Sequence, residues 1–472
     1  MNNKNNTKDL TRRDFIKNTG MAGIFLTSAM ALNGCATKSS SEKKPNIIFL
    51  LTDDQRWDTM GCMGNPIIKT PNMDNLAKEG VLFENSFVTT SICCASRATF
   101  FAGQYTRRHG IIDFKTDFTP DAFSQTYPGL LRSAGYRTGF VGKWGVGNNL
   151  PKQEFDYFEG FGGQGKYYHE ENGKFIHLTS IMGRQAVEFL NGCSKDQPFC
   201  LSVSFKAPHV QDEDPKQFLY DPAYKELYKD TTIPVPKTAD PKYFDALPEY
   251  IQKSEARRRW NVRFSTPEKY QESVKGYYRL IYGVDVVIGK IRETLKELNF
   301  DDNTVIILTG DNGFYLGEHG LAGKWFMHEE SLRTPLIIYD PRLPQSARSE
   351  RKKEMALNVD IAPTILDFAE LEIPDIMQGR SLMGLAYGKK EQWRNEFFYE
   401  HLFEHPTIVK TEGVRNERWK YVRYVDKQPV DEELYDLVND PLEEKNIIAE
   451  KGNEEILNQL RERWKELREN LK

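Results

Sequence analysis

Apolar residues fall in short continuous runs along the middle of the chain, and helical patterns separate these runs. Five of the runs predict strands buried on both faces, at residues 45–52, 138–141, 199–205, 304–309 and 336–339. The helical patterns lie between them, at residues 73–78, 130–134, 182–190 and 272–298. Because strand and helix alternate, the sequence predicts an α/β fold with a large, mostly parallel sheet sandwiched by helices.

This alternation stops before the C-terminal end. Residues 418–424 alternate with period two, as a half-exposed strand does, and residues 433–437 lead into a turn signal. An amphipathic helical pattern follows over residues 454–471. We therefore predict a main domain over residues 45–392 and a smaller C-terminal subdomain over residues 393–472.

The first residues are typical of an export signal. Residues 11–17 resemble the twin-arginine export consensus. The apolar run 20–32 is shorter than the ~20 residues that a membrane-spanning helix needs. It ends in Leu-Asn-Gly-Cys35, which resembles a lipobox. We predict a twin-arginine lipoprotein signal over residues 1–35, with Cys35 lipidated.

This interpretation makes the protein an exported bacterial lipoprotein, periplasmic or anchored at the outer membrane or cell surface. It would contact the membrane through its lipid anchor only, and residues 36–44 would form a polar tether. An ordinary cleaved signal or a plain membrane anchor is the alternative.

Composition narrows the range of partners. Charged residues make up 28% of the chain and apolar residues 39%, as in an ordinary globular protein. The formal net charge of −4 gives no support to nucleic-acid binding. Any affinity for a negatively charged substrate must therefore come from a local cluster of cations.

Two of the predicted strands end in adjacent oxygen-bearing side chains. Asp53 and Asp54 follow the first strand, and Asp311 and Asn312 follow the fourth. The carboxyl ends of strands in an open α/β sheet form the edge where ligands bind. Carboxylate and amide oxygens favour Ca²⁺ or Mg²⁺ over softer metals. The alternative is that these side chains cap helices or face solvent in loops.

A third candidate lies in residues 91–110. Cys93 stands just ahead of a run that can be helical, and Arg97, four positions on, shares its face. The first N–H groups of a helix have no internal partner and favour an anion. The stretch could therefore bind a tetrahedral oxyanion next to a nucleophile, although a cysteine among apolar residues is often only a small buried hydrophobe.

Together these motifs resemble the type I sulfatases of the alkaline phosphatase superfamily. The signature positions that match are Cys93, Ala95, Ser96, Arg97 and the pair Ala102-Gly103. The resemblance extends from residue 45 to the last helix and implies a sulfuric ester hydrolase. It also implies that the C-terminal subdomain is a small antiparallel sheet with a helix packed on the main domain.

The resemblance implies a modified cysteine and one calcium ion. A maturation enzyme would convert Cys93 to formylglycine (3-oxoalanine), whose hydrate offers one hydroxyl to attack sulfur and a second whose deprotonation then expels sulfate. Sulfatases hold calcium with the formylglycine and with residues that match Asp53, Asp54, Asp311 and Asn312.

Family context also assigns the remaining catalytic residues. Arg97, Lys143 in Gly-Lys-Trp and Lys324 in Gly-Lys-Trp would bind the sulfate. His209, which follows Ala-Pro, matches the general acid, a role that suits a group titrating near neutrality. Without that context, the lysines would be taken for surface charges and the histidine for a structural residue.

One position departs from the family pattern. Many sulfatases have a histidine directly after Gly-Lys-Trp, and this chain has Gly145 there. His109 and His328 could replace it, although a structural role is slightly favoured for each. The remaining cysteines, Cys62, Cys94, Cys193 and Cys200, could form disulfides in three ways, and their spacing does not choose among them.

The substrate is the least determined feature. Residues 208–267 are rich in proline, tyrosine and charge, in a place where sulfatases carry variable insertions that shape the substrate pocket. Arg257–Arg259 could reach anionic groups of a substrate, but a solvated helix face is the stronger interpretation. We expect a sulfated carbohydrate, such as ulvan or another algal polysaccharide, or a glycosaminoglycan.

Two other functions stay open at this point. One is a phosphodiesterase or phosphonate hydrolase of the same superfamily, although many of those have a two-metal site and this chain has only eight histidines. The other is a non-catalytic glycan-binding lipoprotein that keeps the fold without turnover.

Overall fold

The computed structural model describes residues 43–471. The predicted signal, the lipidation of Cys35 and most of the tether fall outside the described residues. Residues from Lys43 onward form one compact unit that includes both the predicted main domain and the C-terminal subdomain. Within the described part of the chain, no helix is long and apolar enough to cross a membrane.

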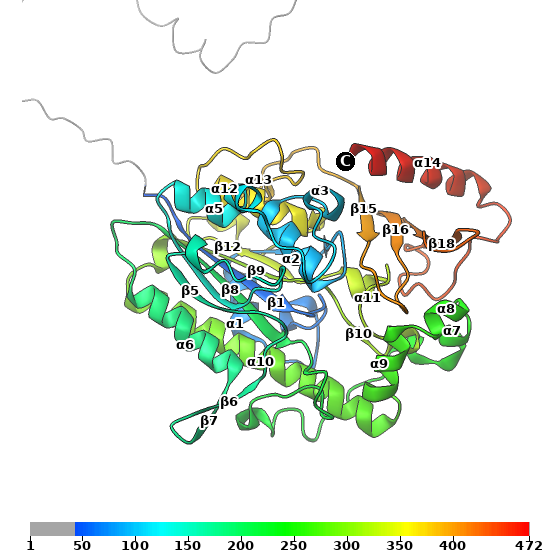
Figure 1. Ribbon diagram of the computed structural model, residues 1–472, viewed down its shortest axis with the longest axis horizontal. Helices are drawn as coiled ribbons and strands as arrows, with labels where there is room; N and C mark the ends of the chain where they lie inside the picture. The colour runs from blue at the N-terminus through cyan, green and yellow to red at the C-terminus, as the bar shows by residue number, and fades with distance from the viewer. Residues whose placement is uncertain (1–42, 472) are drawn as a thin grey trace, which may run out of the picture. The chain divides into compact units, whose positions relative to one another are not determined.

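An eight-stranded sheet lies at the centre of this unit (Figure 1). In spatial order its strands are β13 (Glu350–Lys352), β2 (Val81–Phe83), β12 (Leu336–Tyr339), β9 (Thr304–Gly310), β1 (Asn46–Asp53), β8 (Phe199–Pro208), β4 (Arg137–Lys143) and β5 (Tyr157–Phe161). Only β12 runs antiparallel to its neighbours. All five predicted strands are present, and the predicted mostly parallel sheet is confirmed.

Helices cover both faces of the sheet (Figure 1). One face carries α1 (Pro71–Glu79), α6 (Leu178–Asn191) and α10 (Pro267–Glu297), and the other carries α2 (Cys93–Ala102), α5 (Tyr127–Ser133) and α12 (Ile361–Phe368). In β1, Ile48 and Leu50 pack into the first core while Ile47, Phe49 and Leu51 pack into the second. Burial on both sides explains why the strand is a continuous apolar run.

The segment after β8 forms short elements instead of a strand or long helix. They are η3 (Pro222–Tyr224), η4 (Lys237–Ala239), α7 (Pro241–Asp245), α8 (Glu249–Gln252) and α9 (Glu255–Arg263). Of these, α9 packs against the short strand β11 (Ala322–Gly323). The proline-rich insertion therefore places a helix beside the segment that carries Lys324.

Smaller elements complete the main domain. The helical ones are η1 (Gly61–Met63), α3 (Thr106–His109), α4 (Pro120–Ser124), η2 (Lys152–Glu154), η5 (Asp301–Asn303), η6 (Glu318–Gly320), α11 (Glu329–Leu332), η7 (Gln345–Ala347), η8 (Asn358–Asp360) and α13 (Met383–Ala386). The remaining strands pair as β10 (Tyr315–Leu316) with β11, β3 (Ser86–Phe87) with β14 (Ala356–Leu357), and β6 (Tyr168–Glu171) with β7 (Lys174–His177).

The C-terminal subdomain is a separate antiparallel sheet of four strands with one long helix, as expected. The strands are β15 (Glu396–His401), β16 (Thr411–Asn416), β17 (Trp419–Tyr424) and β18 (Asp431–Asp436), and the helix is α14 (Glu454–Asn470). Buried Lys420 ties this sheet to the main domain, because its Nζ lies 2.9 Å from Glu329 and 2.6 Å from Glu443.

Glu433 in β18 gives the subdomain a pH-dependent stability. Its buried carboxylate accepts a hydrogen bond from the Tyr424 hydroxyl at 2.9 Å, but burial raises its pKa from 4.5 to about 7. The unfolded chain releases this proton near pH 4.5, whereas the folded protein keeps it until about pH 7. The folded state thus binds more protons between these values, so the free energy of unfolding falls as the pH rises.

The free energy of unfolding that is lost as the pH rises through this range is on the order of 1–3 kcal/mol. We expect Glu433→Gln, which has no proton to release, to abolish this pH dependence. Denaturant unfolding at pH 5 and pH 8 should show a smaller decrease for the variant than for the wild type. Glu417→Gln, in an exposed turn of the same subdomain, is the control and should behave as wild type. An equal decrease in all three proteins would contradict the prediction.

Candidate active site

The two acidic strand ends meet at one edge of the sheet. β1 and β9 are neighbours in parallel register, with Thr52 opposite Gly310, so both deliver their next residues to the same place. The backbone N–H of Asp54 donates to Asp311 Oδ1 at 3.0 Å, and Asn312 Nδ2 donates to Asp54 Oδ1 at 2.7 Å. This is the arrangement that the two apolar runs predicted.

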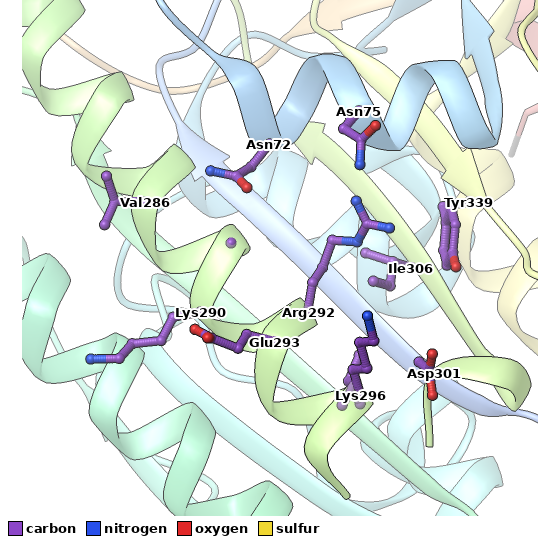
Figure 2. A pocket seen from close by; sticks show the side chains of 12 residues that line it. Asn72, Asn75, Val286, Lys290, Arg292, Glu293, Lys296, Asp301, Ile306 and Tyr339 are labelled. Carbon is purple, nitrogen blue, oxygen red and sulfur yellow. The ribbon is translucent and has the colours of Figure 1, made fainter. Parts of the chain in front are cut away.

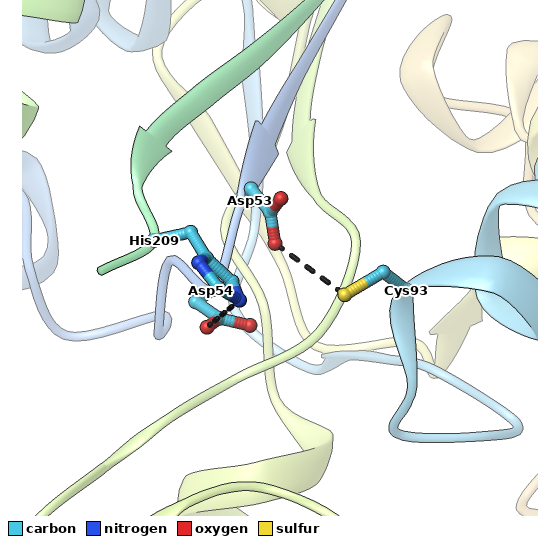
Figure 3. A group of neighbouring side chains, drawn as sticks. All are labelled: Asp53, Asp54, Cys93 and His209. Atoms are coloured by element: carbon cyan, nitrogen blue, oxygen red, sulfur yellow. Dashed lines mark hydrogen bonds and ion pairs between the residues drawn. The ribbon is translucent and has the colours of Figure 1, made fainter. Parts of the chain in front are cut away.

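Cys93 lies at the start of α2 and points to these carboxylates (Figure 3). Its Sγ is 3.6 Å from Asp53 Oδ1 and 3.1 Å from Lys324 Nζ. Burial, and then the charge of Asp53, raise the pKa of the Cys93 thiol to about 11. The unmodified thiol is therefore protonated at neutral pH and is a poor nucleophile.

Three cations converge on the same point. Lys143 Nζ lies 2.5 Å from Asp53 Oδ2, and Lys324 Nζ donates to Asp54 Oδ1. Arg97, one turn after Cys93, donates from Nε to Asp311 Oδ2 at 2.9 Å. All three cationic side chains are nearly or fully buried.

His209 approaches from the end of β8 (Figure 3). Its Nε2 lies 3.6 Å from Asp54 Oδ2, while its Nδ1 is 2.7 Å from the carbonyl oxygen of Val210. Burial holds the pKa of His209 well below its usual range, and the neighbouring lysines, Lys324 first, lower it further. This differs from the near-neutral titration that we expected of the residue.

The donor set fits a hard cation. One ligand atom each from Asp53, Asp54, Cys93 and His209 lie within 4.8 Å of one another. Asn312 Oδ1 is buried without a hydrogen-bond partner. Burial and the charge of Asp53 raise the pKa of Asp311 to about 7, so the charge of this carboxylate is not fully stabilised by its neighbours. Oxygen ligands in this state suit Ca²⁺ or Mg²⁺.

All nine residues singled out from the sequence thus lie in one cluster. They come from six separate segments of the chain: Asp53, Asp54, Cys93, Arg97, Lys143, His209, Asp311, Asn312 and Lys324.

Comparison with known proteins identifies the family of the chain. A family model described as Sulfatase matches residues 45–371, most of the chain. The chain belongs to the sulfatase family. It is therefore an enzyme that hydrolyses sulfuric esters. A second model, described as N-sulphoglucosamine sulphohydrolase, C-terminal, matches residues 317–470 of this sulfatase.

Individual relatives agree with the family. An N-acetylglucosamine-6-O-sulfatase from Bacteroides thetaiotaomicron is 30% identical, and the match covers 94% of this sulfatase and 90% of the relative. A solved structure described as a complex with its substrate D-glucosamine-2-N,6-O-disulfate has a TM-score of 0.80 at 28% identity, covering 91% of this chain and 98% of that one.

A more distant structure shows the fold alone. The phosphonate monoester hydrolase of Agrobacterium radiobacter has a TM-score of 0.70 at 21% identity, covering 91% of this chain and 96% of that one. The fold is thus shared by enzymes of different reactions, and the reaction of this sulfatase follows from its family and its site.

The structure shows that the space beside Gly145 is already filled. Gly145 has a φ of +73°, and a Cβ built on it would lie 2.6 Å from Arg97 Cδ. The stem of Arg97 occupies the space that a side chain would need. Both candidate replacements have structural partners: His109 bonds Thr99 and Ile111, and His328 Nδ1 contacts the Tyr315 hydroxyl.

We expect Gly145→Ala to lower kcat/KM because it displaces Arg97. The new Cβ must displace the arginine stem, and the left-handed backbone adds strain. Because Arg97 holds Asp311, kcat/KM should fall about 10²–10³-fold, as for loss of one fixed donor. Gly163→Ala, also at positive φ but with open space around it, is the control. Similar steady-state kinetics for both variants would contradict the prediction.

Several supporting residues were missed by sequence reasoning. Lys143 Nζ donates to Gln164 at 2.8 Å, and Arg97 Nη1 donates to Ser204. Lys206 is a further buried cation, whose Nζ donates to the carbonyl of Val210 at 2.9 Å. Ser204 and Lys206 could have been found, because a polar residue inside the apolar strand β8 suggests a functional contact. Nothing in the sequence around the loop residue Gln164 indicated its contact with Lys143.

The remaining cysteines and the groove beside α1 are separate from this site. In residues 43–471 all five cysteines are free, so none of the open disulfide pairings forms there. A groove of about 760 Å³ lies between α1 and α10 (Figure 2), lined by residues such as Asn75, Arg292 and Lys296. It opens over the sheet near the start of β9, whereas the active site lies at the end of that strand.

Proposed function

We propose that this sulfatase removes sulfate from a carbohydrate, with a glucosamine sulfate ester of a glycosaminoglycan as the first candidate. The observation that carries the reaction is the meeting of Cys93 with buried carboxylates and cations at the end of β1. The sugar is supported by the N-acetylglucosamine-6-O-sulfatase that matches 94% of the chain.

We propose further that residue 93 acts as formylglycine. Its hydrate would attack the sulfur with one hydroxyl oxygen, which breaks the sulfur–oxygen ester bond and releases the sugar oxygen. Loss of the proton from the second hydroxyl would then break the bond between that residue and the sulfate, which regenerates the aldehyde. Asp53, 3.6 Å from the sulfur of Cys93, is placed to accept this proton.

The surrounding side chains would bind and protonate the substrate. Lys143, Lys324 and Arg97 would neutralise the sulfate oxygens, each charge being fixed by a carboxylate before substrate arrives. His209 would donate a proton from Nε2 to the leaving sugar oxygen in its imidazolium form, since the carbonyl of Val210 already accepts the Nδ1 proton. The negative charge of the bound sulfate ester would favour this charged form against the burial that lowers the pKa of His209.

We propose that one Ca²⁺ binds beside this residue and would be held by Asp53, Asp54, Asp311, Asn312 and residue 93. When bound, it supplies Lewis-acid polarisation. We expect added Ca²⁺ to raise the Tm of the wild type after chelation, and to raise that of Asp311→Asn much less. Asp301→Asn, away from the site in η5, is the control and should respond as wild type. If added Ca²⁺ did not change the Tm of any of these proteins, the proposal that the site binds calcium would be wrong.

The decisive experiment is a substrate screen with protein co-expressed with a formylglycine-generating enzyme. We expect sulfate release from glucosamine 6-O-sulfate and its oligosaccharides, and little turnover of an aryl phosphate diester. Preference for the diester would support the phosphodiesterase alternative. Glycan binding without sulfate release, by protein whose mass shows the conversion of Cys93, would support the binding-protein alternative. Ulvan oligosaccharides belong in the same screen.

We also propose export and lipidation at the N-terminus. The support is the twin-arginine pattern followed by Leu-Asn-Gly-Cys35. Labelling with radioactive palmitate in a bacterial host should mark the wild type and not Cys35→Ala. Equal labelling of both would refute the lipobox.

A further inference from the structure

Three successive arginines of α9 point to different surroundings. Arg258 is exposed and pairs with Glu255. Arg257 lies between the rings of Phe244 and Trp260, at 3.8 and 3.9 Å from their centroids. Arg258 thus faces solvent, as the stronger interpretation of the run predicted, whereas Arg257 packs between aromatic rings and does not.

Arg259 instead lies beside the segment that carries Lys324. Its guanidinium lies over the ring of Trp325, 5.0 Å from the centroid, and Trp325 directly follows Lys324. A Cβ built on Gly323, the residue before Lys324, would contact Arg259 Cδ at 3.8 Å. The side chain of Arg259 keeps 17% of its surface exposed, so it remains open to a ligand.

A second arginine lies beside it, one helical turn along α9. Arg263 is four positions after Arg259 and shares its face. Both reach the same oxygen: Asp212 Oδ1 lies 3.4 Å from Arg259 Nη1 and 2.8 Å from Arg263 Nη2. Asp212 is only three residues after His209, so the arginine pair adjoins the catalytic histidine.

The positive charge of this group is not balanced. Arg258, Arg259 and Arg263 share two carboxylates, those of Glu255 and Asp212. Arg263 is 1% exposed, and its Nη1 is buried without a hydrogen-bond partner. Burial, and next the charge of Arg259, lower the pKa of Arg263 to about 9. A buried guanidinium in this state is stabilised by an added anion.

Arg259 and Asp212 are more exposed than the catalytic cluster, whereas Arg263 is buried. The side chain of Asp212 is 37% exposed and that of Arg259 17%, whereas those of Lys324 and His209 are only 4% exposed. A sugar whose sulfate reaches residue 93 would therefore bring its other substituents past Arg259.

We propose that Arg259, supported by Arg263 and Asp212, binds a second anionic group of the substrate, a sulfate or a carboxylate, beside the sulfate that is removed. The enzyme would accordingly select sugars that carry two negative groups. This inference rests on the proposed carbohydrate sulfatase activity.

The test compares substrates that differ in one group. D-glucosamine-2-N,6-O-disulfate and N-acetylglucosamine 6-O-sulfate share the same scissile ester, and a uronate-linked N-acetylglucosamine 6-O-sulfate disaccharide supplies a carboxylate instead. We expect wild type to favour one of the two dianionic substrates by about 10–100-fold in kcat/KM, the range of one charged hydrogen-bonded contact. The favoured substrate identifies the group as sulfate or carboxylate.

Arg259→Gln should remove that preference and leave turnover of the monoanionic sugar within about threefold of wild type, an effect under ~1 kcal/mol. Arg259→Lys, which keeps the positive charge, should retain part of the preference for the dianionic substrate. Arg258→Gln on the exposed side of the same helix is the matched control and should keep the full preference.

Two results would overturn the inference while leaving the sulfatase activity intact. One is equal kcat/KM of wild type on all three substrates. The other is an equal decrease on all three in Arg259→Gln, which would show a structural role. Absence of turnover on every sulfated sugar, by protein with converted Cys93, would refute the proposed function itself.

Discussion

Cys93→Ala is expected to abolish sulfate ester hydrolysis, the largest effect of any single substitution in this protein. The change removes the only side chain of the cluster that can become a formylglycine, while the carboxylates and cations stay in place. We expect kcat/KM to fall by at least about 10⁴-fold, as for loss of a nucleophile. This decrease in kcat/KM can be measured from the rate of sulfate release from glucosamine 6-O-sulfate.

The neighbouring cysteine provides the control. Cys94 is also buried in α2 but packs in an apolar cluster, and Cys94→Ala should keep both its activity and the conversion of Cys93. Intact-mass measurement should show the conversion of a CH2–SH group to an aldehyde, with loss of one sulfur and two hydrogens and gain of one oxygen, in wild type and Cys94→Ala only. Substantial activity of Cys93→Ala would exclude residue 93 as the nucleophile.

Lys324→Met is expected to have the second-largest effect. Lys324 Nζ contacts both the sulfur of Cys93, at 3.1 Å, and Asp54 Oδ1, so it sits where the sulfate oxygens would be bound. Methionine keeps the length of the side chain and removes the charge. We expect kcat to fall by about 10²–10³-fold, the typical loss for one fixed donor in a buried site.

Loss of stability must be separated from loss of catalysis in this variant. Lys420→Met removes another buried lysine that bridges two carboxylates, at the junction with the C-terminal subdomain. Breaking its ion pairs should cost about 3–5 kcal/mol of stability and leave kcat per folded molecule unchanged. If Lys324→Met lost only stability, measured by its Tm, and kept its kcat, its role would be structural.

Sequence reasoning succeeded where the relevant information is local. The apolar runs identified β1 and β9 because a strand buried on both faces must be apolar throughout. Their carboxyl ends then had to meet, since parallel neighbours finish at the same edge of the sheet. Short motifs around Cys93, Lys143, His209 and Lys324, recognised by their resemblance to sulfatases, supplied the rest of the cluster.

The sequence by itself therefore determined the α/β fold, the acidic strand ends and the membership of the catalytic cluster. Only the tertiary structure decided that Arg259 packs on Trp325, next to Lys324, while Arg258 turns to solvent. It also decided that Arg97 fills the space at Gly145, and which polar groups hold the lysines. The physical reason is that strand burial and motif spacing are properties of neighbouring residues. The direction of a side chain, and the room around it, depend on segments that meet only when the chain folds.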